Sequence, residues 1–238
     1  MHLAQSHYLP LTPAFFSILV GLVALLFLFI QLRILRYAYL RLGLSPGAAL
    51  LLLVGSLVGA YFNIPVAQLP AERVVSGQIV DFYGMRYVVP VVAQWPGTLI
   101  AVNVGGALIP TAMSIYLLLR YRVFAQAAIA TAAVAAVCYA LSDPVPGVGI
   151  AIPVFVPAIA TAIVAFLLSR DYAAPLAYIA GSLGTLIGAD LLNLGRIQGL
   201  GAPVASIGGA GTFDGIFLTG ILAVLLASLT RRTTPAPR

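Results

Sequence analysis

Long apolar runs, separated by short polar stretches, dominate this sequence. The run AFFSILVGLVALLFLFIQLRI begins at residue 14 and carries one charged residue, Arg33. A helix needs about 20 mostly apolar residues to cross the hydrocarbon core of a bilayer. Of the 238 residues, 62% are hydrophobic and only 8% are charged, whereas soluble domains carry about 25% charged residues. The sequence therefore predicts an all-α polytopic membrane protein, with a single integral membrane domain over residues 1–238.

The positions of the runs predict about seven transmembrane helices. The expected spans cover residues 13–33, 45–64, 97–119, 124–142, 150–169, 173–193 and 212–230. The first run is too long and too uniformly apolar for the core of a signal peptide, and no basic region precedes it. We therefore expect this run to remain in the mature protein.

The basic residues, all of them arginine, indicate an orientation. With seven spans, only Arg73, Arg86 and Arg196 fall on one side of the membrane and the other arginines fall on the opposite side. Arginine is enriched in cytoplasmic loops, so we expect a protein of the cell membrane with its N-terminus outside and its C-terminus in the cytoplasm. The arginines occur in ones and twos rather than on one face, which favours the lipid bilayer over nucleic acid as a partner.

The loop between the second and third spans predicts a small extracytoplasmic β-hairpin at about residues 73–90. Residues alternate in character from Val74 to Tyr83, Gly84 permits a tight turn, and MRYVV follows. An isolated hairpin is only marginally stable in water, so we expect it to rest on the helix ends. It would act there either as a plug or as a lid or strand edge for a partner.

Residues that break helices interrupt several of the expected spans. The second span ends in YFNIPV, which contains Asn63, and the third carries VNVGGALIPTAMSIY, which contains Asn103 and Pro110. Proline frees a carbonyl in a helix, and a carbonyl freed inside a bilayer needs a polar partner. Two interpretations follow: kinked helices in a tightly packed bundle, or broken helices that line a polar cavity, as in transporters.

Two aspartates are the most unusual charges in the chain. Asp190 lies near the outer end of the sixth span and Asp214 at the start of the seventh, so both fall at similar depth on neighbouring helices. An ionised carboxylate near hydrocarbon is costly unless it reaches water or a partner. Asp143 lies where the fourth span leaves the membrane; its Asp-Pro sequence is typical of a turn, and membership of the same site is the alternative.

Glycines on the sixth and seventh spans would let the two helices approach and bring the acids together. If Asp190 and Asp214 share a site, one of them keeps its proton near neutral pH. Alternatively, each acid caps a helix end, as Asp214 could do for the seventh span. The candidate catalytic residues are Asp190 and Asp214, and the candidate supporting residues are Gly188, Asn193, Gly209, Gly211, Gly215, Thr219, Asp143, Asn63 and Asn103.

Five blocks of the sequence resemble a known family. They are NIPV, VNVGGALIP, PGVGI, LIGADLL and SIGGAGTFDGIFLTG. Together they are similar to the family called domain of unknown function 1614, a group of bacterial and archaeal membrane proteins without an assigned activity. The resemblance covers nearly the whole chain from residue 15 onward, and it implies an integral membrane protein.

A looser resemblance connects the two acids with intramembrane aspartyl proteases of the presenilin and prepilin-peptidase type. These enzymes carry one Asp on one helix and a Gly-x-Gly-Asp motif on another. Here Gly209-Ala210-Gly211 precedes Asp214 with Thr212 and Phe213 inserted, and no Pro-Ala-Leu element follows the second acid. The resemblance implies that Asp190 and Asp214 form a catalytic dyad.

Three functions remain open from the sequence. The first is an intramembrane aspartyl protease that cleaves a transmembrane peptide, the second is a small proton- or cation-coupled transporter or channel that uses the same aspartates, and the third is a non-catalytic membrane scaffold. None of these needs a cofactor or a metal ion, and the sequence contains no Walker loop, zinc-ligand spacing or dinucleotide motif. The sequence predicts no particular oligomeric state.

Overall fold

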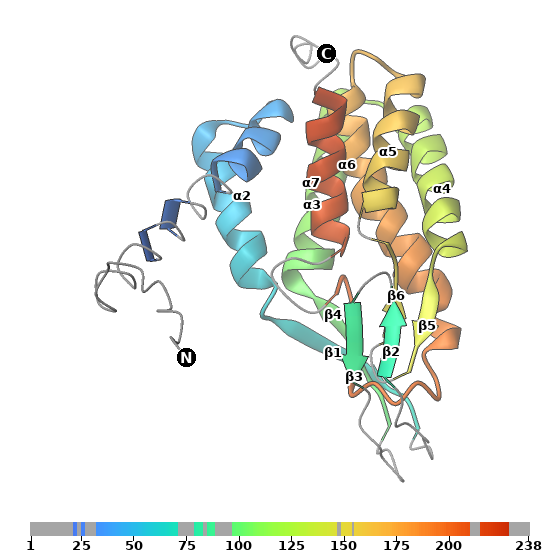
Figure 1. Cartoon of the computed structure of the whole chain (residues 1–238). Helices are drawn as coiled ribbons and strands as arrows, with labels where there is room; N and C mark the ends of the chain where they lie inside the picture. The colour runs from blue at the N-terminus through green and yellow to red at the C-terminus, as the bar shows by residue number, and fades with distance from the viewer. Residues whose placement is uncertain are drawn as a thin grey trace, which may run out of the picture.

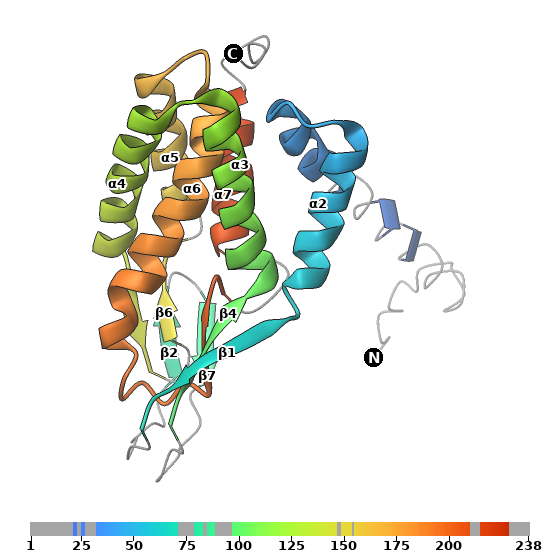
Figure 2. The same cartoon turned by 180° about the vertical axis from the view of Figure 1, so that it is seen from behind.

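Helices and strands occupy opposite ends of the molecule (Figure 1, Figure 2). The computed structural model describes residues 21–22, 25–26, 32–70, 79–82, 85–88, 97–146, 149–153, 155–209 and 215–228. Residues 32–41 are helical. The further α-helices are Pro46–Gly59 (α2), Ile109–Tyr121 (α3), Phe124–Ala140 (α4), Phe155–Leu168 (α5), Ala173–Thr185 (α6) and Gly215–Ser228 (α7). The fold is therefore mostly helical.

A three-stranded mixed sheet lies at the strand end of the bundle. Its strands are Asn63–Gln68 (β1), Leu99–Asn103 (β4) and Val204–Ile207 (β7), in the order β1-β4-β7. Strand β1 pairs antiparallel to β4 and β7 pairs parallel to it. Pro65 is tolerated because β1 is an edge strand, where a missing N–H breaks no ladder bond. Two short hairpins accompany this sheet: Ile79–Phe82 (β2) with Met85–Val88 (β3), and Asp143–Val145 (β5) with Gly149–Ala151 (β6).

The helices place small residues inside the bundle and large apolar residues outside it. On α5, Ala158, Thr161 and Ala165 are buried, whereas Leu167 is 76% exposed. Soluble proteins bury most of their large aliphatic side chains. Membrane helices instead pack through small residues, because lipid is as apolar as leucine. This distribution, together with the apolar helices, is that of a membrane protein.

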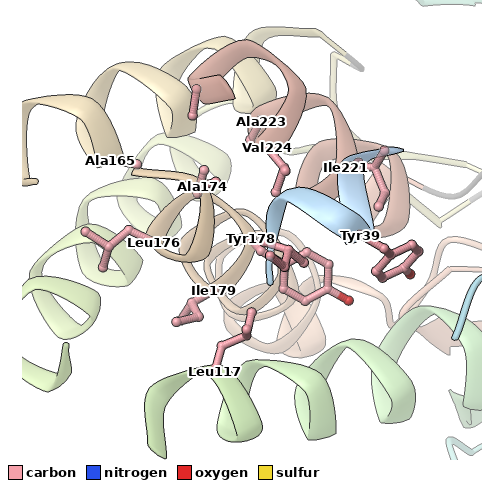
Figure 3. Packing of buried hydrophobic residues seen from close by; sticks show 14 of the residues in the cluster. Tyr39, Leu117, Ala165, Ala174, Leu176, Tyr178, Ile179, Ile221, Ala223 and Val224 are labelled. Atoms are coloured by element: carbon pink, nitrogen blue, oxygen red, sulfur yellow. The ribbon is translucent and has the colours of Figure 1, made fainter. Parts of the chain in front are cut away.

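Two helical segments of the described chain are long and apolar enough to cross a membrane, namely Val104–Tyr121 and Ala173–Arg196. Helices α2, α4 and α5 are apolar but shorter. Helix α6 lies in the middle of the bundle, where it packs against α3, α4, α5 and α7. Figure 3 shows Leu176, Tyr178 and Ile179 of α6 among the buried residues of these neighbours.

Glycines allow the closest approaches between helices. A Cβ atom on Gly181 of α6 would lie 3.2 Å from the Cα of Gly220 on α7, and a Cβ on Gly184 would lie 2.7 Å from the side chain of Val134 on α4. Small residues at such crossings let backbones approach and gain dispersion energy. The glycines of α6 and α7 predicted the approach at Gly181 and Gly220, whereas Gly184 packs against α4 instead.

Both segments of spanning length contain irregular turns. The first begins with a π-helical turn, Val104–Leu108 (η1), directly after β4. The second continues from α6 into a π-helical turn, Leu186–Asp190 (η2), and then a 3-10 turn, Leu191–Arg196 (η3). Turns of this kind leave carbonyls without their usual helical partners and are frequent at functional sites.

The ends of three expected spans were wrong. Residues 63–64, 99–103 and 150–151 lie in strands rather than in helices. Between the sixth and seventh expected spans, residues 204–207 form the strand β7. Hydropathy averaged over twenty residues does not separate a short apolar strand from the helix that follows it. Most of the expected span 13–33 lies outside the described residues.

The hairpin within residues 73–90 is present. Strands β2 and β3 are antiparallel, with Asp81 opposite Arg86. Residues 73–78, 83–84 and 89–90 of the expected hairpin lie outside the described part of the chain. The alternating pattern and the expected position of the turn therefore located the two strands correctly.

Candidate functional site

Asn103 connects the sheet to the end of α2 and to the π-helical turn η1. Its side chain is 1% exposed, and its Nδ2 donates to the carbonyl of Ala60 at 2.8 Å and to Oδ1 of Asn63 at 3.1 Å. Its Oδ1 accepts the backbone N–H of Gly106 at 2.8 Å, which caps the π-helical turn η1. A buried amide is stable only when its donors and acceptor are used. Asn103 therefore fixes α2, β1 and η1 relative to one another.

Asn63 extends this contact across the sheet. The two asparagines face each other in the β1–β4 register. Oδ1 of Asn63 also receives a hydrogen bond from the hydroxyl of Ser206 at 2.6 Å, and that hydroxyl lies 2.5 Å from the carbonyl of Gly209. All three strands of the sheet thus contribute a polar side chain to one cluster.

Asp190 reaches the same region from the end of η2. Its Oδ2 accepts the backbone N–H of Gly208 at 2.7 Å. Gly208 has φ +92°, and a Cβ there would lie 2.5 Å from the backbone nitrogen of Ala107 in η1. Only glycine fits this conformation and this space. We call Asn63, Asn103, Asp190, Ser206 and Gly208 the polar junction.

The turn that carries Asp190 packs closely against α4. A Cβ on Gly188 would lie 2.3 Å from the carbonyl oxygen of Ala135. Asn193, which is fully buried, donates from Nδ2 to the carbonyls of Gly188 and Ala189 at 2.9 and 3.0 Å. The side chain of Asn193 therefore satisfies carbonyls that the irregular turn leaves without helical partners.

Arg196 connects this turn to the neighbouring hairpin. Its Nη1 donates to Oδ1 of Asn193 at 2.9 Å and to the carbonyl of Ser142 at 3.3 Å. Ser142 precedes Asp143, which begins β5 and is exposed. A charged donor strengthens the hydrogen bonds that it makes, so Arg196 holds η3 against the end of α4.

The predicted site residues separate into two groups. The described structure brings Asn63 and Asn103 into contact, and it binds Asp190 to Gly208, two residues after the Ser206 that contacts Asn63 and Gly209. Asn193 and Gly188 instead support the turn that carries Asp190. Gly215 begins α7, and Thr219 is fully buried on that helix. Asp214 and Gly211 lie outside the described residues.

Sequence reasoning missed four residues that build this region: Ser142, Arg196, Ser206 and Gly208. A signal was present for two of them, because the stretch VASIGG places a serine and a glycine pair at the end of a short β-branched run. The partners of Arg196 follow from tertiary packing, which local sequence does not encode.

The junction is chemically a group of oxygen acceptors and amide donors. It offers one carboxylate, two carboxamides, a hydroxyl and nearby backbone groups within a short distance of two irregular turns. Oxygen ligands of this kind suit hard cations. Among the described residues, no group of three or more His, Cys, Asp or Glu side chains gathers in one place.

Comparisons with known proteins identify a family. No curated protein and no solved structure matches the chain. The model of the family described as "Protein of unknown function (DUF1614)" matches residues 57–226, which include the sheet, the polar junction and helices α3 to α6. The sequence blocks that resembled this family lie within or beside that range. The chain belongs to the DUF1614 family.

Proposed function

We propose that this protein is a small transporter or channel of the cell membrane that moves protons or a small cation past Asp190. One observation carries the proposal. The carboxylate of Asp190 lies at an irregular turn within a segment of membrane-spanning length, and it contacts a glycine packed on the irregular turn of a second such segment. Transporters commonly place their ion sites where two spanning helices are interrupted.

The energetics of a bilayer support this assignment. An acid within a spanning segment is costly, and such acids usually mark ion or proton paths. The interrupted helices free backbone carbonyls, which are tolerated at membrane depth only where they meet protein or a water-filled space. The carbonyls of η2 meet the Asn193 side chain, and the junction adds the side-chain oxygens of Asp190, Asn63 and Ser206. A proton or cation could therefore exchange its water ligands for these oxygens.

The second acid belongs to this proposal through the chain itself. Gly208, which donates to Asp190, precedes Asp214 by six residues. Two carboxylates that share a site titrate as a pair, and one of them holds a proton near neutral pH. The pair would then bind one exchangeable proton or one monovalent cation. Asp190 and Asp214 are the ion-binding residues in this proposal.

Flux measurements test the proposal directly. Purified protein in liposomes should dissipate an imposed pH gradient or take up labelled Na⁺, and Asp190→Asn and Asp214→Asn should each reduce the flux to the level of empty liposomes. Asn keeps the size of the acid but cannot ionise. Asp171→Asn, at an exposed acid near the start of α6, is the matched control and should leave the flux unchanged.

An intramembrane aspartyl protease is the second candidate. The Asp190–Gly208 hydrogen bond supports it, because it holds one acid against the segment that leads to the other, as a catalytic dyad requires. A reporter that contains a transmembrane segment should then be cleaved by the wild type and by Asp171→Asn, but by neither Asp190→Asn nor Asp214→Asn. Cleavage without flux would replace the transporter proposal. Absence of both activities in the wild type would leave a membrane scaffold.

We further propose that the chain crosses the membrane seven times, with the N-terminus and the β2–β3 hairpin outside. The distribution of arginines supports this topology, because most of them fall on one side of the expected spans. Reporter fusions should place residues 66–95 and 195–210 outside the cell. They should place residues 34–44, 120–123 and 231–238 inside. A cytoplasmic reporter at residue 80 together with a cytoplasmic C-terminus would contradict the seven-span topology.

A further inference from the structure

Four hydroxyl groups inside the helix bundle have no hydrogen-bond partner at ordinary distance and angle within the described structure. They belong to Tyr39, Ser56, Ser114 and Thr219, each of which is at most 2% exposed. They come from four different helical segments: residues 32–41, α2, α3 and α7. A buried hydroxyl without a partner destabilises a protein, so four of them in one bundle require an explanation.

Two of these hydroxyls, those of Tyr39 and Ser56, lie together beside α6. The Tyr39 side chain lies near Ser56 and Tyr178, close enough to interact with both. The rings of Tyr39 and Tyr178 are 6.2 Å apart, and Figure 3 shows the two side chains next to each other. Further along α6, the Oγ of Ser182 would lie 2.7 Å from a Cβ on Gly220, the neighbour of Thr219. The hydroxyl groups of Tyr39, Ser56, Tyr178 and Ser182 therefore lie near one another beside α6.

Other buried hydroxyls of the bundle behave differently. Thr161 donates to the carbonyl of Pro157 and Ser142 to that of Cys138, each four residues earlier and each at 2.6 Å. This bond to the preceding turn is the usual way to satisfy a hydroxyl inside a helix. Ser56, Ser114 and Thr219 also lie in helices with a carbonyl four residues earlier, but they do not use it. Their hydroxyls are thus available to a partner between the helices.

We propose that the hydroxyl cluster, defined as Tyr39, Ser56, Tyr178 and Ser182, binds ordered water molecules inside the bundle. Buried waters occupy sites with two to four polar partners and satisfy groups that would otherwise be unpaired. Ser56 lies one helical turn before Ala60, whose carbonyl binds Asn103 of the polar junction. The waters therefore extend the polar region from the junction toward the middle of the bundle. The hydration itself does not depend on the proposed ion transport.

Radiolytic footprinting tests this site in the wild-type protein. Hydroxyl radicals formed from bound water oxidise the side chains next to that water, even when bulk solvent does not reach them. Tyr121 is the matched control, because it is 4% exposed and its hydroxyl already donates to the carbonyl of Leu42 at 3.0 Å. With water bound in the cluster, Tyr39 and Tyr178 should be oxidised at least about threefold faster than Tyr121. Equal or slower oxidation of Tyr39 and Tyr178 would overturn the proposal.

A variant makes the test specific to the cluster. Ser56→Val removes a hydroxyl next to Tyr39 and adds a methyl group in its place, so the oxidation of Tyr39 should fall to the Tyr121 rate. Ser142→Ala is the control, because its hydroxyl uses a carbonyl of its own helix, and it should leave Tyr39 unchanged. An unchanged Tyr39 rate in Ser56→Val would contradict the assignment. If Ser56→Val does not fold, the wild-type comparison decides. If the wild-type protein shows no ion flux but Tyr39 and Tyr178 are still oxidised faster than Tyr121, the proposed function is refuted and this site is not.

Discussion

The polar junction and the hydroxyl cluster handle buried polar groups in opposite ways. At the junction, Asn103 uses both its amide hydrogens and its oxygen within the protein, at distances of 2.8 to 3.1 Å. In the cluster, the hydroxyls of Tyr39 and Ser56 make no hydrogen bond of ordinary distance and angle among the described residues. The first arrangement fixes backbone segments in place, whereas the second leaves hydrogen-bonding capacity for a solvent molecule.

The difference follows from the backbone of each region. Strands, π-helical turns and loops leave N–H and C=O groups that side chains can bind, as Gly106 and Gly208 show at the junction. Regular α-helices use their own backbone groups internally. A polar side chain between such helices must therefore bond to the preceding turn, to another side chain or to water. The comparison predicts that substitutions at the junction lower the free energy of unfolding more than substitutions in the cluster do.

The largest effect is expected at Gly105 of η1, which packs against α2 next to the junction. A Cβ there would lie 2.1 Å from the carbonyl oxygen of Ser56 and 2.4 Å from the nitrogen of Ala60. Because both neighbours are backbone atoms, α2 must move away from η1. Gly105→Val should reduce the free energy of unfolding by about 3 kcal/mol, which corresponds to a melting temperature roughly 6–12 °C lower. Thermal unfolding in detergent measures this change.

A glycine on the same helix pair gives the control. A Cβ on Gly55 of α2 would have only the side chain of Ile109 nearby, at the ordinary contact distance of 3.7 Å. Gly55→Ala should therefore keep or slightly raise the melting temperature, because alanine favours a helix by about 1 kcal/mol over glycine. Equal destabilisation by the two variants would show that α2 and η1 do not pack closely at Gly105.

Asn103 should show the next largest effect. Asn103→Leu keeps a similar volume but leaves the N–H of Gly106 and the carbonyl of Ala60 without their bonds. We expect a loss of about 2 kcal/mol, since each buried group without a partner costs about 1–3 kcal/mol. Asn63→Leu should cost only about 0.5 kcal/mol, because Asn63 is exposed and water can replace it. A larger effect at Asn63 would mean that the sheet, not the cap of η1, holds the junction.

The sequence predicted the helical membrane class and the helix contacts better than the strand end. Apolar runs located the helices, and glycine spacing on α6 and α7 predicted the approach at Gly181 and Gly220. Alternation located β2 and β3. Strands β1, β4 and β7 were missed, because each is only four to six residues long and two of them adjoin an apolar helix. Their pairing is set by contacts between residues far apart in the chain.

The sequence indicated which residues form the candidate site, but not which groups they bind. Asn63, Asn103 and Asp190 stood out, because polar groups are rare in apolar spans. Their partners did not, since the Ser206 hydroxyl and the Gly208 N–H reach them only after β7 pairs with β4. The hydroxyl cluster was also missed, because serine and threonine inside apolar helices usually bond to their own helix. Only the packed structure shows that Ser56, Ser114 and Thr219 do not.

The smallest expected effect separates a hydrated cluster from a dry one. Tyr121→Phe removes the hydrogen bond to the carbonyl of Leu42, so it should lower the free energy of unfolding by about 1 kcal/mol. Tyr39→Phe removes a hydroxyl that makes no hydrogen bond of ordinary geometry within the protein.

In a dry bundle, Tyr39→Phe would remove the desolvation cost of that buried hydroxyl and raise the free energy of unfolding by about 1 kcal/mol or more. In a hydrated cluster, the hydroxyl already bonds to water that is nearly as good a partner as protein. Stability should then stay the same or fall slightly. Thermal unfolding of the two variants in parallel decides between these states, because both remove the same atom from a buried tyrosine.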